Sequence, residues 1–187
     1  MSVELALLTL DRGREAPRAA RLRAMMGDHF QTVWRSLRRL GVPEASADDS
    51  AQQVFVVAAR RLEEIEVGGE RRYLLGIALR VASDARRTIS RRREVPMDSE
   101  AAGTSVLLER PLQPDEELEQ KRSLALLASL LDEMSDELRE AFVLFELEEL
   151  SAPEVAKVLE VPVGTVASRV RRARERLRES LVKRGTP

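Results

Sequence analysis

The chain has 187 residues, of which 43% are hydrophobic and 34% charged, and its formal net charge is −1. This composition predicts a soluble globular protein that forms one large helical domain or two small ones. The absence of cysteine excludes disulfides and thiolate zinc sites, and a single histidine argues against a catalytic triad or a zinc-activated water, so we expect no metal, no cofactor and no enzymatic activity.

Residues 1–24 are basic and weakly patterned, and we assign them no function beyond that of an N-terminal extension. Glu4 interrupts their short apolar run, whereas a secretory signal needs a basic start followed by a long apolar stretch. We therefore expect a cytoplasmic protein that does not insert into a membrane.

Apolar residues recur at helical spacing along the rest of the chain, and no segment alternates with a period of two, which predicts an all-α fold. Three apolar stripes predict three helices that close a first small domain over residues 25–93. Gly41 to Pro43 separate the first two helices, and Gly68 and Gly69 precede the third. The stripes are Met26, Phe30, Val33, Leu37 and Leu40, then Ala47, Ala51, Val54, Phe55, Ala58 and Leu62, then Tyr73, Leu74, Ile77, Ala78, Val81 and Ala85.

The periodicity fades between Glu94 and Pro114, where prolines and a glycine lie among small and polar residues. Such a composition is typical of a linker, which we place at residues 94–117. Further stripes predict a four-helix C-terminal domain over residues 118–187. The expected architecture is two small helical domains joined by a flexible linker.

Charge is segregated along the chain although it nearly cancels in total. Arginines cluster within residues 86–93 and 169–178, and acidic residues gather between them, at 115–119 and 132–149. Two basic surfaces that flank an acidic middle create local positive potential, to which a polyanion responds.

The segment SAPEVAKVLEVPVGTVASRVRRARERL predicts a helix-turn-helix. Ser151 and Glu154 have the spacing of a capping box, and Pro153 is tolerated in the first turn of the helix that they start. Pro162 ends this short helix, and a new apolar stripe begins at Val163. Two short helices joined by a tight turn are the signature of the motif.

The second helix of the motif carries arginine, serine and threonine opposite its apolar stripe. Such a helix fits the major groove of B-DNA, where arginine donates to guanine and a hydroxyl contacts a base or a phosphate. An arginine-rich face is often only solvated, but here the cap, the turn and the second stripe occur together, which favours DNA binding. The residues expected to contact the duplex are Thr165, Ser168, Arg169, Arg171, Arg172 and Arg174.

With the residues before it, from Asp136 onward, this segment resembles region four of the extracytoplasmic-function (ECF) sigma factors of the sigma-70 family. These proteins are subunits that give bacterial RNA polymerase its promoter specificity. The resemblance implies that the helix-turn-helix reads the minus-35 promoter element. Two positions depart from the family pattern, because Glu149 replaces a usual glycine and Ala167 replaces a long basic or polar side chain.

The stretch LRRLGVPEASADDSAQQVFVVAARRL resembles region two of the same family, whose pattern of acidic residue, glutamine and phenylalanine is filled by Asp49, Gln52 and Phe55. Asp49, Gln52 and Gln53 project from the side opposite the apolar stripe. The resemblance implies that they bind core RNA polymerase at the clamp coiled coil of its largest subunit. Without the resemblance, a solvated helix face is the preferred interpretation of the same residues.

The next segment, RRYLLGIALRVASDARRTISRRR, resembles the end of region two, which in the family melts and captures the minus-10 element. Arginines neutralise phosphates, and an aromatic ring offers a surface on which single-stranded bases stack. Tyr73 replaces the family's tryptophan and also belongs to the apolar stripe, which favours core packing over base stacking for it. Arg80 replaces an asparagine. The loop at about residues 63–70, which is acidic here, corresponds to the family's pocket for a flipped base. The expected minus-10 residues are Tyr73, Arg80, Arg86, Arg87 and Arg91.

The resemblance covers most of the chain and implies a sigma factor that binds core RNA polymerase and directs promoter-specific transcription initiation. It also implies promoter DNA and an anti-sigma factor as partners. Two other interpretations account for less of the sequence. An operator-binding helix-turn-helix regulator explains only the C-terminal half, and a helical protein-binding adaptor leaves both arginine clusters without a purpose.

Overall fold

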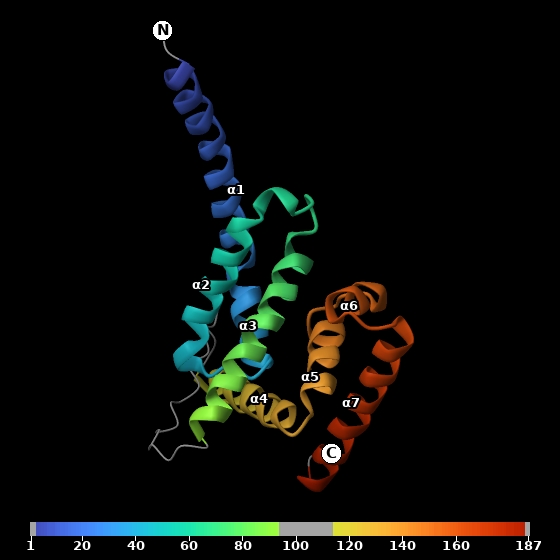
Figure 1. Ribbon diagram of the computed structural model, residues 1–187. Helices are drawn as coiled ribbons and strands as arrows, with labels where there is room; N and C mark the ends of the chain where they lie inside the picture. Colours follow the sequence, from blue (N-terminus) through green and yellow to red (C-terminus); the bar gives the residue numbers. More distant parts are fainter. Residues whose placement is uncertain (1–2, 94–113, 186–187) are drawn as a thin grey trace.

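The structure is a computed structural model that describes the backbone of residues 3–93 and 114–185 and the side chains of residues 16–88 and 122–185. Every regular element in these ranges is a helix, which confirms the predicted all-α fold. In Figure 1 the three long N-terminal helices pack together, and the C-terminal helices lie beside and below them. The main helices are α1 (Val3–Arg39), α2 (Glu44–Arg60), α3 (Glu70–Arg93), α4 (Pro114–Asp132), α5 (Asp136–Phe142), α6 (Ala152–Leu159) and α7 (Val163–Lys183).

The first core forms between α1, α2 and α3, as their apolar stripes predict. Leu37 of α1, Val54 of α2 and Leu74 of α3 are fully buried. The rings of Phe30 and Phe55 stack with their centroids 6.0 Å apart and join α1 to α2. Apolar periodicity therefore identified the buried face of each of these helices.

The N-terminal extension continues the first helix. α1 begins at Val3, well before the first predicted stripe, and Figure 1 shows its first turns projecting beyond α2 and α3. Arg21 donates hydrogen bonds to the backbone oxygens of Leu62 and Ile65, at 3.0 Å and 2.5 Å, and lies 3.3 Å from the Glu70 carboxylate. The extension thus braces the loop that leads into α3.

A π-helical turn, η2 (Val143–Leu147), follows α5 and leads to a backbone reversal. Glu149 lies in this reversal with a φ of 52°, in the left-handed region. Residues with a Cβ atom rarely adopt that conformation because the Cβ crowds the neighbouring carbonyl oxygen. The local backbone therefore favours glycine at this position, the residue that Glu149 replaces in the family pattern.

The two halves of the chain pack against each other. One apolar cluster joins the N-terminal helices to Leu131, Met134 and Phe142, and a second places Leu75 of α3 among C-terminal residues that include Leu144. Gly41, with a φ of 91°, permits a close approach, because a Cβ atom there would overlap the guanidinium of Arg139. The segment 94–113, which holds most of the predicted linker, lies outside the described residues.

Candidate nucleic-acid interface

The helix-turn-helix forms as predicted, from α6 and α7. Glu154 Oε2 accepts hydrogen bonds from the hydroxyl and the backbone N–H of Ser151, at 2.7 Å and 3.0 Å, which completes the capping box. These two bonds, that of the hydroxyl first, lower the pKa of Glu154. α6 ends at Glu160, whose φ is 56°, and Pro162 stands directly before α7. The cap, the short helix and the turn are those that the sequence indicates.

Apolar contacts fix which side of α7 faces the protein. Val166 and Val170 are at most 4% exposed. They lie in one apolar cluster with Val155 and Ala156 of α6. The two helices of the motif are therefore held together by their buried faces, and the opposite side of α7 faces the solvent.

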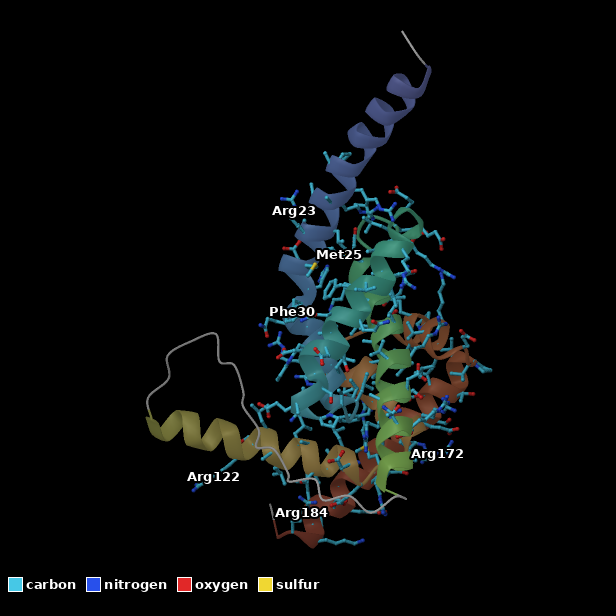
Figure 2. All side chains as sticks on the ribbon, turned by 60° about the vertical axis from the view of Figure 1, so that its left-hand side comes forward. Arg23, Met25, Phe30, Arg122, Arg172 and Arg184 are labelled. Atoms are coloured by element: carbon cyan, nitrogen blue, oxygen red, sulfur yellow. The ribbon has the colours of Figure 1, made fainter. Side chains whose placement is uncertain are left out.

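The solvent-facing side of α7 carries a row of hydrogen-bonding groups. Arg171 and Arg172 are exposed, and Figure 2 shows Arg172 at the edge of the molecule. Arg172 Nε donates to the carbonyl oxygen of Ser168 at 3.3 Å, and the Ser168 hydroxyl donates to that of Thr165 at 2.9 Å. Arg171 pairs with Glu175 at 2.7 Å. These groups lie on one helix face, in the arrangement that the major groove accepts.

Two of the six predicted duplex-contacting residues are held by the domain itself. Arg169 is only 16% exposed in its side chain and lies 3.1 Å from the carboxylate of Glu137. Arg174 is half exposed and donates through Nε to Glu146 at 2.8 Å. Both arginines therefore tie α7 to the segment around α5, and they flank the row of exposed groups.

The predicted minus-10 residues of α3 do not form one open face. Tyr73 is half-buried against the first core, and Arg87 is exposed beside Asp84. Arg80 is exposed and lies 3.1 Å from Glu160. Arg86 is only 13% exposed in its side chain. The side chain of Arg91, the fifth predicted residue, lies outside the described residues.

Arg86 is enclosed by acceptors from both halves. It donates to the backbone oxygen of Leu40 at 2.5 Å and to Glu140 at 2.9 Å. Its Nε lies 3.2 Å from Asp136 Oδ1 without being aligned for a hydrogen bond. Burial raises the pKa of Glu140, and the Arg86 bond opposes this effect. Carboxylates of the C-terminal half thus hold an arginine that the sequence assigns to DNA.

These acidic partners are the functional residues that the sequence analysis missed. The acidic middle of the chain was recognised as a cluster, but Glu140 pairs with Arg86, 54 positions away, and Glu148 pairs with Arg39, 109 positions away. No local pattern encodes a contact over such a separation.

Two buried apolar side chains hold the loop before α3 against the first core. Leu62 and Ile65 are buried, and Gly68 has a φ of 83°. A hydrogen bond from its own backbone N–H lowers the pKa of Glu70, and the guanidinium of Arg21 adds to this effect. The acidic side chains of Glu63, Glu64 and Glu66 are exposed.

The residues predicted to bind polymerase lie together on the outer face of α2. Asp49, Gln52 and Gln53 are all exposed, while Phe55 on the opposite side is buried. Val56 is 46% exposed and lies three residues after Gln53, on the same face. This apolar residue within a polar surface was not singled out in the sequence.

No cluster of three or more potential metal ligands occurs among the described residues. Within the same ranges, no helix is both long enough and apolar enough to cross a membrane.

Residues 124–177 match the family described as sigma-70, region 4. The chain is 30% identical over 159 residues to the ECF RNA polymerase sigma factor SigE of Mycolicibacterium smegmatis, covering 85% of this chain and 61% of that protein. It is 30% identical to the RNA polymerase sigma factor CnrH of Cupriavidus metallidurans, with 82% of each chain covered. It is 34% identical to the RNA polymerase sigma-E factor of Streptomyces coelicolor, with 80% of each covered.

Two solved structures of sigma factors are similar to this chain in fold. The structure of CnrH in complex with the cytosolic domain of CnrY matches with a TM-score of 0.63 at 26% identity, covering 87% of this chain and 88% of that one. The sigma factor RpoE of Bartonella quintana, solved with the anti-sigma factor NepR, matches in fold with a TM-score of 0.66 at 20% identity, covering 85% and 95%.

Proposed function

Because the chain belongs to the ECF sigma factors of the sigma-70 family, whose members direct promoter-specific transcription initiation, we propose a division of this task between its two halves. Residues 25–93 bind core polymerase and engage the minus-10 element. Residues 118–187 bind the minus-35 duplex, and residues 94–117 connect the two. The operator-binding regulator and the adaptor are not favoured by the relatives.

The observation that carries the minus-35 assignment is the outer face of α7. Thr165, Ser168, Arg171 and Arg172 follow one another on the side of the second helix that the apolar contacts leave free. In this mode the N-terminal residues of the helix lie nearest the bases. Arg169 and Arg174 keep α7 at its angle to α5 and lie close enough to the row for phosphate contacts.

The polymerase assignment depends on the outer face of α2. Asp49, Gln52 and Gln53 supply acceptors and amides, and Val56 supplies a small apolar patch among them. A partner helix of the clamp coiled coil meets both kinds of group on this face. The proposed site needs no rearrangement of the N-terminal core.

Co-elution of the purified chain with bacterial core RNA polymerase tests the function. We expect stoichiometric binding by the wild type and none by an Asp49→Ala, Gln53→Ala double variant. A matched double variant on α1, Asp28→Ala with Gln31→Ala, removes the same residue types from another helix and should bind normally. Absence of binding by the wild type at micromolar concentration would refute the proposed function.

Three further properties complete the proposal. The chain itself catalyses nothing and lends specificity to the polymerase, as its relatives do. It acts in the cytoplasm, where the polymerase is found. An anti-sigma protein regulates it, which is supported by the complex of the sigma factor RpoE of Bartonella quintana, a protein of similar fold, with the anti-sigma factor NepR.

A further inference from the structure

A guanidinium of the N-terminal extension holds the segment that joins α2 to α3. Arg21 donates from Nη1 to the backbone oxygen of Leu62 at 3.0 Å and from Nη2 to that of Ile65 at 2.5 Å. The same Nη2 lies 3.3 Å from Oε1 of Glu70, the first residue of α3. Arg21 therefore contacts both ends of this segment, the α2–α3 loop (residues 61–69).

Arg18 adds a second contact one turn earlier on α1. It donates to the backbone oxygen of Ala59 at 2.6 Å, in the last turn of α2. Carbonyl groups at the end of a helix lack an intrahelical partner, and they carry a partial negative charge that a guanidinium stabilises. The fork of N–H donors in arginine allows one side chain to bind several oxygens. The extension thus supplies donors to carbonyl groups at the end of α2 and within the loop.

The tip of the α2–α3 loop is exposed and suits an uncharged ligand. Val67 is 91% exposed, and a Cβ atom on Gly68 would meet no described residue within 4 Å apart from its chain neighbours. A glycine in open space allows a ligand to approach the backbone closely. Three exposed carboxylates of the loop, those of Glu63, Glu64 and Glu66, repel a phosphate. An unpaired base, which is flat and uncharged, therefore fits this tip better than the phosphate backbone does.

Hydrogen bonds join the tip of the loop to the first turn of α3. The N–H of Gly69 donates to the oxygen of Glu66 at 3.0 Å, and the N–H of Tyr73 donates to the oxygen of Gly69 at 3.0 Å. Tyr73 is the aromatic residue that the sequence assigns to the minus-10 element. The loop and the start of α3 are therefore one hydrogen-bonded unit, and Arg21 fixes the side of it that lies against α1.

We propose that Arg21, assisted by Arg18, is a positioning residue for minus-10 DNA, which holds the α2–α3 loop in the shape that receives an unpaired base. The inference rests on the proposed function, which assigns the minus-10 element to residues 25–93, and it gives the N-terminal extension a part in that task. Arg21 acts through the loop, because its guanidinium is already occupied by loop oxygens and Glu70. The apparent affinity for the strand falls in proportion to the fraction of molecules whose loop has this shape.

Amide hydrogen exchange in the free chain tests whether Arg21 holds the loop. In Arg21→Ala we expect the peptide of residues 62–70 to exchange at least about tenfold faster, because one charge-assisted hydrogen bond shifts a local opening equilibrium by about that factor. Arg23→Ala is the matched control, since Arg23 is exposed and donates to Ala19 of its own helix at 3.2 Å. It should leave this peptide unchanged. Peptides of α6 and α7 should exchange alike in all three proteins, which marks the effect as local.

Selection of single-stranded DNA by the holoenzyme tests the consequence for minus-10 binding. The probe is a pool of oligonucleotides with a short random central segment, and the strand that the wild-type holoenzyme enriches most is then compared with a scrambled strand by fluorescence anisotropy. We expect Arg21→Ala to bind core polymerase normally but to lose at least about tenfold in affinity for the enriched strand and less for the scrambled one. Arg23→Ala should behave as the wild type. A role in stability alone would lower the melting temperature without changing the preference between the strands.

Two results would overturn the proposal: wild-type exchange of residues 62–70 in Arg21→Ala, or an unchanged preference for the enriched strand. If Arg21→Ala does not fold, Arg21→Lys decides the matter by the same two measurements, because lysine keeps the charge but lacks the planar fork. We expect it to exchange faster than the wild type and to select strands less well, and wild-type values in both would overturn the proposal. Failure of the proposed function is recognised separately, because the wild-type chain would then neither bind core polymerase nor enrich any strand.

Discussion

Replacing Glu149 by glycine should stabilise the protein. The residue is exposed and has a φ of 52°, a conformation that costs a residue with a Cβ atom about 1–2 kcal/mol. Glycine removes this cost but gives the unfolded chain extra freedom that opposes folding by about 0.4–1 kcal/mol. The net gain in the free energy of unfolding is therefore about 1 kcal/mol. For a chain of this size the melting temperature should rise by about 2–4 °C.

Urea and thermal unfolding of three proteins, the wild type, Glu149→Gly and Glu149→Ala, separate backbone strain from charge. Alanine removes the same carboxylate as glycine but keeps the Cβ atom, so its unfolding free energy should stay within about 0.5 kcal/mol of the wild type. If alanine stabilises as much as glycine, the benefit comes from removing a charge close to Glu146 and Glu148, and the strain argument is wrong. A destabilised glycine variant would refute it as well.

Three other perturbations have defined outcomes. Gly41→Ala should lower the free energy of unfolding in urea by about 1–2 kcal/mol, because its φ is 91° and its Cβ atom requires the Arg139 guanidinium to shift; a near-neutral effect would contradict the cost assigned to the backbone conformation. The Glu154 pKa lies below its usual 4.5, so its stabilising contribution is present above pH 4.5 and is lost as the pH falls through the lower folded value; acid titration of stability should lose this component in Glu154→Gln. Arg172→Ala should reduce the preference for promoter over random duplex in fluorescence anisotropy, whereas Arg174→Ala should weaken binding to both alike, and equal losses on both duplexes for the two variants would contradict these roles.

Binding to promoter DNA should weaken steeply as the salt concentration rises, because arginines contact phosphates. Each phosphate that an arginine neutralises releases condensed counterions, so loss of one contact should reduce the slope of log K against log salt by about 1. Arg174→Ala should show that change, and Arg172→Ala should show less of it if its partner is a base.

Local features of the fold were predictable because local residues encode them. The apolar stripes identified the buried sides of α1 to α3, and the pair Ser151 and Glu154 located the start of α6. The position of Glu149 was noticed only as a departure from a family pattern. Its left-handed backbone supplies the physical reason, since the reversal after η2 suits a residue without a Cβ atom.

The pairing of charges was not predictable in the same way. In the sequence, Arg86 is one member of a basic cluster. In the fold, its guanidinium lies between the backbone oxygen of Leu40 and the carboxylate of Glu140, because α5 lies beside the end of α3. Arg169 and Arg174 likewise lie on the flank of the recognition helix, but their acidic partners come from the segment before it. Helical periodicity gives the direction of a side chain relative to its own helix and says nothing about which distant segment lies there.

The apolar cluster that spans the two halves has a consequence for the lifetime of the protein in the cell. Residues of the N-terminal helices cover Leu131, Met134 and Phe142. If the two halves separate while no partner is bound, these apolar side chains become exposed to chaperones and proteases. A population in excess of polymerase would then be removed faster than the bound fraction. The abundance of the protein should follow the supply of its partners.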